Sequence, residues 1–162
     1  MKIILMRHAK SSWNDPLQDD FDRALNGRGR SSATALGNWL RDKHYIPDQA
    51  LVSSSARTKE TFKRLVLECE VNFLETLYHA RPAQMMAELK TANSQTILMI
   101  AHNPGIAWFA QELLAAPPPH PSFFDYPTGA TLVAEFPLKN WRELQPGQGR
   151  ALDFIVPREL TG

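Results

Sequence analysis

The chain has 162 residues, a net charge of +1 and 43% hydrophobic residues, which suits one globular domain with an apolar core. The small net charge gives no global field that attracts nucleic acid or an acidic membrane, so we expect neither as a partner. The opening apolar run is too short for a signal peptide, no run could span a bilayer, and the single cysteine excludes an internal disulfide. We therefore expect one domain, residues 1–162, of a cytoplasmic protein.

Strand and helix patterns alternate along the chain. The apolar run 2–6 predicts a buried strand, and a polar, Asp-rich loop follows it from 11 to 23. Asn26 can cap the next helix, whose apolar residues recur every three or four positions. Further strands are predicted at 50–53, 71–74, 96–101, 130–136 and 152–156, and further helices at 56–68, 82–92 and 104–115. This alternation predicts an α/β fold of three layers (α/β/α), in which helices cover a mostly parallel sheet of about six strands.

Two segments stand apart from this pattern. Residues 116–121 are rich in proline, which lacks an N–H donor, so we expect an ordered surface connection there. Cys69 lies in the helical-looking segment 62–69 and is expected to be a small buried apolar group. The aromatic residues of the segment after the prolines could bind a partner or pack over the sheet: Phe123, Phe124 and Tyr126.

Polar motifs follow three of the predicted strands. Arg7 and His8 come after strand 2–6, Arg57 lies in the first helical turn after strand 50–53, and His102 follows strand 96–101. Taken singly, such residues are usually ion-pair partners, solvated helix residues or helix caps. The carboxyl ends of parallel strands, however, meet at the edge of the sheet where ligands bind. If the strands are neighbours, two arginines and two histidines converge on one point.

A phosphoryl group is the ligand that such a cluster fits. Its charge is spread over three oxygens, and the planar fork of an arginine binds two of them at once. Helix N-termini near Ala56 and Pro104 would add oriented N–H groups. A neutral histidine can attack phosphorus while its other ring nitrogen donates to a backbone carbonyl. No metal is implied, because the histidines lack ligand spacing with cysteines or carboxylates, and no cofactor is expected.

The sequence also resembles a known family. The run Arg7-His8-Ala9-Lys10-Ser11-Ser12-Trp13-Asn14 is similar to the Arg-His-Gly-x-Ser-x-Trp-Asn signature of the histidine phosphatase superfamily, which includes cofactor-dependent phosphoglycerate mutases. Later motifs also match in order, over roughly residues 1–110: Leu25–Gly29, the Ser53, Arg57, Thr61 pattern, and His102-Asn103-Pro104-Gly105. The short interval between Arg57 and His102 leaves no room for a capping insertion, so the chain looks most like the small SixA-type phosphohistidine phosphatases.

The resemblance implies a phosphoglycerate mutase-like fold and a role for each matching residue. His8 would be the nucleophile that is transiently phosphorylated, and Arg7, Arg57 and His102 would hold the phosphoryl oxygens. Asn14 and Ser11 would lie at the pocket rim. The implied substrate is a protein phosphohistidine. A small-molecule phosphomonoesterase or mutase on the same scaffold is one alternative, and a non-catalytic phosphate-binding module is another.

The chain departs from the family pattern in two places. Ala9 replaces the usual glycine and adds only a methyl group, which we expect to be tolerated. The loop 77–81 lacks the carboxylate that protonates the leaving group in many superfamily phosphatases. A phosphohistidine needs less help, because its imidazole can already carry a proton, whereas an alkoxide must receive one. Residues that could still donate a proton, or could merely be solvated loop residues, are Asp19, Asp20, Asp22 and His79.

Overall fold

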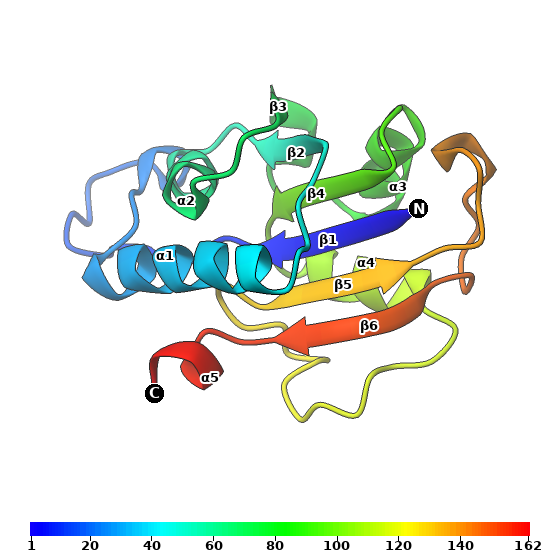
Figure 1. Ribbon diagram of the computed structural model, residues 1–162. Coiled ribbons are helices and arrows are strands. Elements are labelled where there is room, and N and C mark those ends of the chain that lie inside the picture. Colours follow the sequence, from blue (N-terminus) through cyan, green and yellow to red (C-terminus); the bar gives the residue numbers. More distant parts are fainter.

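The computed structural model describes all 162 residues and contains one six-stranded sheet. The strand order is β3-β2-β4-β1-β5-β6 (Figure 1). Only β5 runs against its neighbours, so the prediction of a mostly parallel sheet is confirmed. The strands in chain order are β1 (Lys2–Arg7), β2 (Gln49–Ser53), β3 (Glu70–Leu74), β4 (Thr96–Ala101), β5 (Thr131–Glu135) and β6 (Arg150–Ile155).

Helices cover both faces of the sheet, which gives the predicted three layers (Figure 1). One face carries α1 (Gly27–Asp42), α2 (Ala56–Leu65) and the short α5 (Arg158–Thr161), and the other carries α3 (Pro82–Lys90) and α4 (Gly105–Leu113). Three 3₁₀ turns complete the fold: η1 (Asp20–Asp22), η2 (Glu75–Leu77) and η3 (Trp141–Glu143). None of the helices combines the length and apolar character needed to cross a membrane.

The central strand β1 is apolar because both of its faces are covered. Ile3 and Leu5 belong to the core beneath α3 and α4, while Ile4 and Met6 belong to the core beneath α1 and α2. All four side chains are fully buried. A continuous apolar run is what a parallel strand covered on both faces requires. The residue at which this run stops, Arg7, therefore marks the edge of the sheet.

The helix ends follow local backbone chemistry. The Asn26 side chain accepts a hydrogen bond from the Gly29 N–H at 2.8 Å, which confirms the predicted cap of α1. The predicted helix 56–68 ends early, at Leu65, because Val66 adopts a left-handed conformation with φ 55°. Cys69 therefore lies in the irregular stretch before β3 and is only half-buried, so its prediction as a buried helical residue was wrong.

The last third of the chain differs from its prediction in detail. The strand expected at 152–156 begins at Arg150, and residues 116–121 are irregular and mostly exposed, as expected for the proline segment. Phe123 and Tyr126 are fully buried against the core, whereas Phe124 is 58% exposed. Of the two alternatives, Phe123 and Tyr126 therefore pack over the sheet.

Candidate active site

The three polar motifs converge because their strands are neighbours. β4 pairs in parallel with both β1 and β2, so all three strands end at the same edge of the sheet. The His8 and His102 ring centroids are 5.3 Å apart. The Arg57 Nε lies 3.3 Å from the His8 Nε2, and its Nη2 lies 3.3 Å from the His102 Nδ1. With Arg7, these residues line a pocket of about 310 Å³.

His8 presents one ring nitrogen to this pocket. Its Nδ1 lies 2.7 Å from the Ala9 carbonyl oxygen and must donate to it, so Nε2 is unprotonated and its lone pair accepts from the Arg57 Nε–H at 3.3 Å. Burial lowers the pKa of His8 to about 3, assisted by the charges of Arg57 and Arg7 and opposed by the bond to Ala9. The ring is therefore neutral at pH 7.

His102 is held in the opposite orientation. Its Nδ1 faces the Arg57 guanidinium, which can only donate, so Nδ1 accepts and the Nε2–H donates to the Ser53 Oγ at 2.8 Å. Burial, followed by the His8 ring and the Arg57 charge, lowers the pKa of His102 to about 2. Two neutral imidazoles thus face one another beside a fixed positive charge.

One N–H group of the Arg7 guanidinium has no hydrogen-bond partner. Its Nη1 donates to the Tyr126 carbonyl oxygen at 3.2 Å, while its buried Nε has no hydrogen-bond partner. Burial and the nearby charge of Arg57 lower the pKa of Arg7. A buried N–H without a partner is costly, and an anion in the pocket would satisfy it.

A carboxylate of the protein already lies against the arginines. The Asp20 Oδ2 lies 3.0 Å from the Arg57 Nη2, and the Asp20 carbonyl oxygen accepts from Nη1 at 2.7 Å. The carboxylate also contacts Arg23, Tyr78 and His79, at 2.9, 2.5 and 3.2 Å. Burial opposes ionisation, but the hydrogen bonds from Tyr78, Arg23 and Arg57 hold the pKa of Asp20 well below its usual range. Asp20 is therefore an anion next to the histidine pair.

The structure adds Arg23, which the sequence analysis missed. This residue is 7% exposed, and its Nη1 donates to the Ser11 Oγ at 2.6 Å. The exposed indole of Trp13 covers the guanidinium, with the Arg23 Cζ 3.6 Å from the ring centroid. No spacing rule identifies a single arginine in a polar loop. Its position depends on the loop folding back, through the bridge between Ser11 and Leu25.

The two rim candidates differ in their positions. Ser11 is buried and lines the pocket, whereas Asn14 is exposed and does not line it. The other residues lining the pocket come from both loops and strand ends: Lys10, Trp13, Asp20, Arg23, His79, Asn103 and Thr128. No group of three or more His, Cys, Asp or Glu side chains is arranged to hold a metal ion.

Backbone contacts fix the site in place. The Thr61 Oγ1 accepts from the Ala9 N–H at 3.0 Å and donates to the Arg57 carbonyl oxygen at 2.7 Å, so it ties the His8 segment to α2. A Cβ at Gly29 would lie 2.0 Å from the Lys10 carbonyl oxygen. The start of α1 can therefore approach the β1 exit this closely only with glycine at that position.

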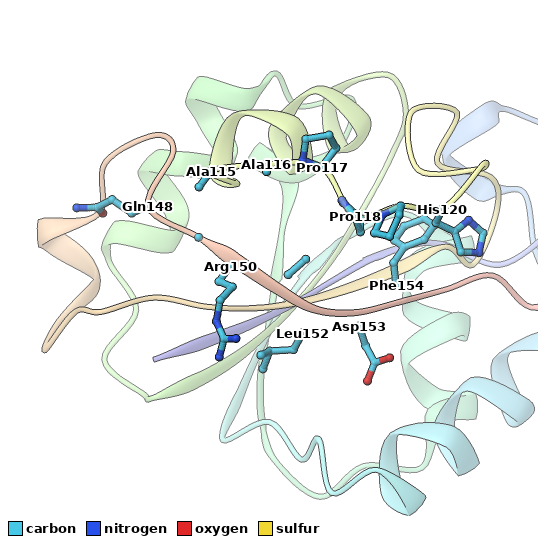
Figure 2. Close-up of a pocket in the computed structure, with 13 residues that line it drawn as sticks. Ala115, Ala116, Pro117, Pro118, His120, Gln148, Arg150, Leu152, Asp153 and Phe154 are labelled. Carbon is cyan, nitrogen blue, oxygen red and sulfur yellow. The ribbon is translucent and has the colours of Figure 1, made fainter.

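A different hollow, of about 610 Å³, lies between the proline segment and β6 (Figure 2). None of the predicted site residues lines it. Its one histidine, His120, pairs with Glu159 at 3.0 Å, and its one arginine, Arg150, pairs with Glu135. The residues drawn there come from 115–120 and 148–154, and no two basic side chains converge. The arginine–histidine cluster is therefore the better candidate for chemistry.

Comparison with known proteins agrees with this geometry. The sequence profile of the histidine phosphatase superfamily (branch 1) matches residues 3–78, so the chain resembles this superfamily over the segment that contains Arg7, His8 and Arg57. The chain is also similar to SixA proteins. The proposed phosphohistidine phosphatase SixA of Nakamurella multipartitia superposes with a TM-score of 0.84 and 26% identity, covering 96% of this chain and 95% of that one.

Two further relatives extend the comparison. The protein histidine phosphatase SixA, solved in complex with tungstate, gives a TM-score of 0.80 at 20% identity over 99% of this chain and 100% of that chain, and shares the fold. An uncharacterized protein of Mycobacterium leprae is 30% identical over 162 residues, which cover 94% of this chain and all of that protein. The predicted phosphoglycerate mutase-like fold is therefore confirmed.

Proposed function

We propose that the protein is a phosphatase that removes the phosphoryl group from a phosphohistidine on another protein, through a covalent intermediate on His8. The observation that carries the proposal is the unprotonated Nε2 of a neutral His8, which lies beside the guanidinium groups of Arg57 and Arg7 and accepts from the Arg57 Nε–H. The match to the superfamily profile and the similarity to SixA proteins support phosphatase chemistry. Residues 1–162 would act as one domain without a metal or cofactor, in the cytoplasm.

In the first step the His8 Nε2 attacks phosphorus in line with the leaving group. The P–N bond of the substrate breaks as the new P–Nε2 bond forms, and the leaving imidazole keeps the electron pair and its ring proton. Arg7 and Arg57 stabilise the charge on the equatorial oxygens, while the neutral ring of His102 accepts from Arg57 and holds its guanidinium in place. The Ala9 carbonyl keeps the proton on Nδ1, so the positive charge that develops on the ring has a fixed acceptor.

In the second step water attacks the phosphoryl group on His8. The P–Nε2 bond breaks, the proton of the water passes to a phosphate oxygen or to solvent, and neutral His8 is regenerated. The low pKa of His8 favours this release, because the site stabilises the uncharged ring. The balance is one substrate and one water consumed, with one dephosphorylated histidine and one phosphate formed.

For an ester substrate, His79 is our candidate proton donor. It occupies the loop where many relatives carry a carboxylate, its ring centroid lies 5.5 Å from that of His102, and its Nε2 contacts Asp20 at 3.2 Å. Its backbone has φ 53°, an unfavourable conformation for a residue other than glycine, and such strain is common at functional sites. Asp20, whose pKa is held low, would orient the imidazole rather than donate a proton itself.

A protein substrate is favoured by the shape and surface of the site. No large insertion lies between Arg57 and His102, where the chain forms only the rest of α2, β3, η2, α3 and β4. The loop beside the pocket exposes Trp13 and Leu17, at 76% and 93%. Apolar side chains exposed next to a catalytic pocket suit contact with a partner surface.

The deciding experiment compares kcat/KM for a phosphohistidine protein with that for a sugar phosphate and a phosphoglycerate. We expect the phosphohistidine protein to be the better substrate. Equal or faster turnover of a small ester would instead establish the small-molecule phosphomonoesterase.

A trapping experiment tests the covalent step. Acid-labile radiolabel should appear on wild-type protein and be absent from His8→Ala, with the circular dichroism spectrum unchanged. Protein that binds phosphate without ever becoming labelled would instead be the non-catalytic phosphate-binding module.

A further inference from the structure

A second pocket, of about 400 Å³, adjoins the catalytic one. Lys10 and Thr128 line both, so the two pockets share a wall at the exit of β1. The far side of the second pocket is formed by α1, through Arg28 and Ser32, and by α5, through Arg158. A substrate whose phosphoryl group reaches His8 thus has its neighbouring atoms next to this pocket.

The second pocket is strongly cationic. Lys10, Arg28 and Arg158 are exposed, and none of them pairs with a carboxylate. No Asp or Glu lines the pocket, although Gly162, the last residue of the chain, does. Elsewhere in the molecule, arginines such as Arg64 and Arg150 have acidic partners. With a net charge of only +1 on the chain, three unpaired cations around one hollow are a local concentration of positive charge.

The pocket floor supplies a neutral donor as well. Ser32 is 7% exposed, its hydroxyl makes no hydrogen bond to the protein, and it faces the same hollow. Guanidinium, ammonium and hydroxyl groups together are the donors that bind carboxylate or phosphate oxygens.

We propose that this pocket binds a second anionic group of the substrate: an acidic side chain near the phosphorylated residue of a protein, or a second phosphate of a small molecule. The inference rests on the proposed function for the position of the first phosphoryl group. It adds to that function a preference for substrates with two anions, one at His8 and one at Arg28 and Arg158.

The test measures binding of unreactive phosphonate peptides by calorimetry, with Asp and Glu or with Asn and Gln flanking the phosphonate residue. Wild-type protein should bind the acidic peptide roughly tenfold more tightly than the neutral one, and high salt should reduce the difference. In Arg28→Gln/Arg158→Gln the two affinities should become equal, with the neutral peptide unaffected. The matched control Lys139→Gln/Arg142→Gln removes two exposed cations beyond the opposite end of β5 and should keep the preference.

A second pair of ligands, a small monophosphonate and a bisphosphonate, identifies the source of the anion. A preference confined to the acidic peptide assigns the pocket to protein substrates, and one confined to the bisphosphonate assigns it to small molecules. Equal binding within both pairs by wild-type protein, or a preference that survives in Arg28→Gln/Arg158→Gln, would overturn the inference. Turnover of the phosphohistidine protein is measured separately. Its absence refutes the phosphatase proposal, while the binding comparison still decides the subsite.

Discussion

The carboxylate of Asp20 lies 3.0 Å from the Nη2 of Arg57, inside the pocket where the two histidines meet. An ion pair at this position competes with any incoming phosphoryl group for the same donors. Binding of a phosphoryl group therefore includes the cost of loosening Asp20, and the resting protein avoids leaving Arg57 without a partner.

Replacement of Asp20 by asparagine should strengthen anion binding. Asp20→Asn removes the competing negative charge but keeps the size of the side chain, so the dissociation constant for tungstate should fall roughly fivefold. Calorimetric titration measures this dissociation constant. The control is Asp22→Asn, which removes an exposed unpaired carboxylate from the same turn and should leave the dissociation constant unchanged. Weaker binding by Asp20→Asn would mean that the carboxylate organises the site rather than competing for it.

Arg57→Lys should lose most activity. The guanidinium uses Nε, Nη1 and Nη2 to reach His8, the Asp20 backbone and the Asp20 carboxylate, and an ammonium group cannot reproduce this planar arrangement. We expect kcat/KM to fall roughly 100-fold. Arg64→Lys, on the exposed part of the same helix, is the control and should retain activity. Near-normal turnover by Arg57→Lys would remove this residue from the phosphoryl site.

His79→Gln should affect poor leaving groups selectively. An alkyl phosphate needs a proton in the transition state, so its kcat should fall at least roughly tenfold, while para-nitrophenyl phosphate, with its good leaving group, should be nearly unaffected. His44→Gln is a matched control, since His44 is exposed and has φ 60°. An equal loss with both substrates would show that His79 only supports the loop.

Stability should fall as the pH is lowered below about 6.5. The pKa of His8 and of His102 is lowered from 6.5 to about 3 and about 2, so between these values the unfolded chain binds more protons than the folded one. The stabilisation is complete above pH 6.5 and is lost as the pH falls towards 3. Each ring contributes a slope of at most about 1.4 kcal/mol per pH unit.

Denaturant unfolding between pH 7.5 and 4.5 measures this slope. The variant His102→Gln should show a shallower dependence than wild type, by about one proton. A free energy of unfolding that stays constant over the range would mean that the two rings are hydrated and titrate normally in the folded protein.

The sequence predicts the sheet and the convergence of the three strand ends because both depend on strong local signals. The apolar run before Arg7 stops at the edge of the sheet, and the strands before Arg57 and His102 end in the same way. Helix ends were less predictable. Val66 is an ordinary helix residue by type, yet it leaves the helix in a left-handed conformation, and the Arg41 guanidinium donates to the Leu65 and Val66 carbonyl oxygens there.

The sequence of the Asp-rich loop did not indicate which of its residues belong to the candidate site. Nothing in the sequence distinguishes Asp20 from Asp19 or Asp22, because the choice depends on which carboxylate the 3₁₀ turn aims at Arg57. The same reason explains why Arg23 was not predicted. The family motif extends through Asn14, but Trp13 and Asn14 are exposed in the structure, whereas Ser11 and Arg23 are buried. Long-range packing of a loop leaves no periodic trace in its sequence.

The residues that line the phosphoryl site and the cationic residues around it are positioned by different parts of the fold. His8 and His102 directly follow β1 and β4, and Arg57 belongs to the first turn of a helix fixed by Thr61, whereas Arg28 and Arg158 project from surface helices. Exchange of the outer side chains leaves the inner framework untouched. Substrate choice in this scaffold is consequently open to redesign, or to divergence between species, by single surface substitutions that do not compromise folding or bond cleavage.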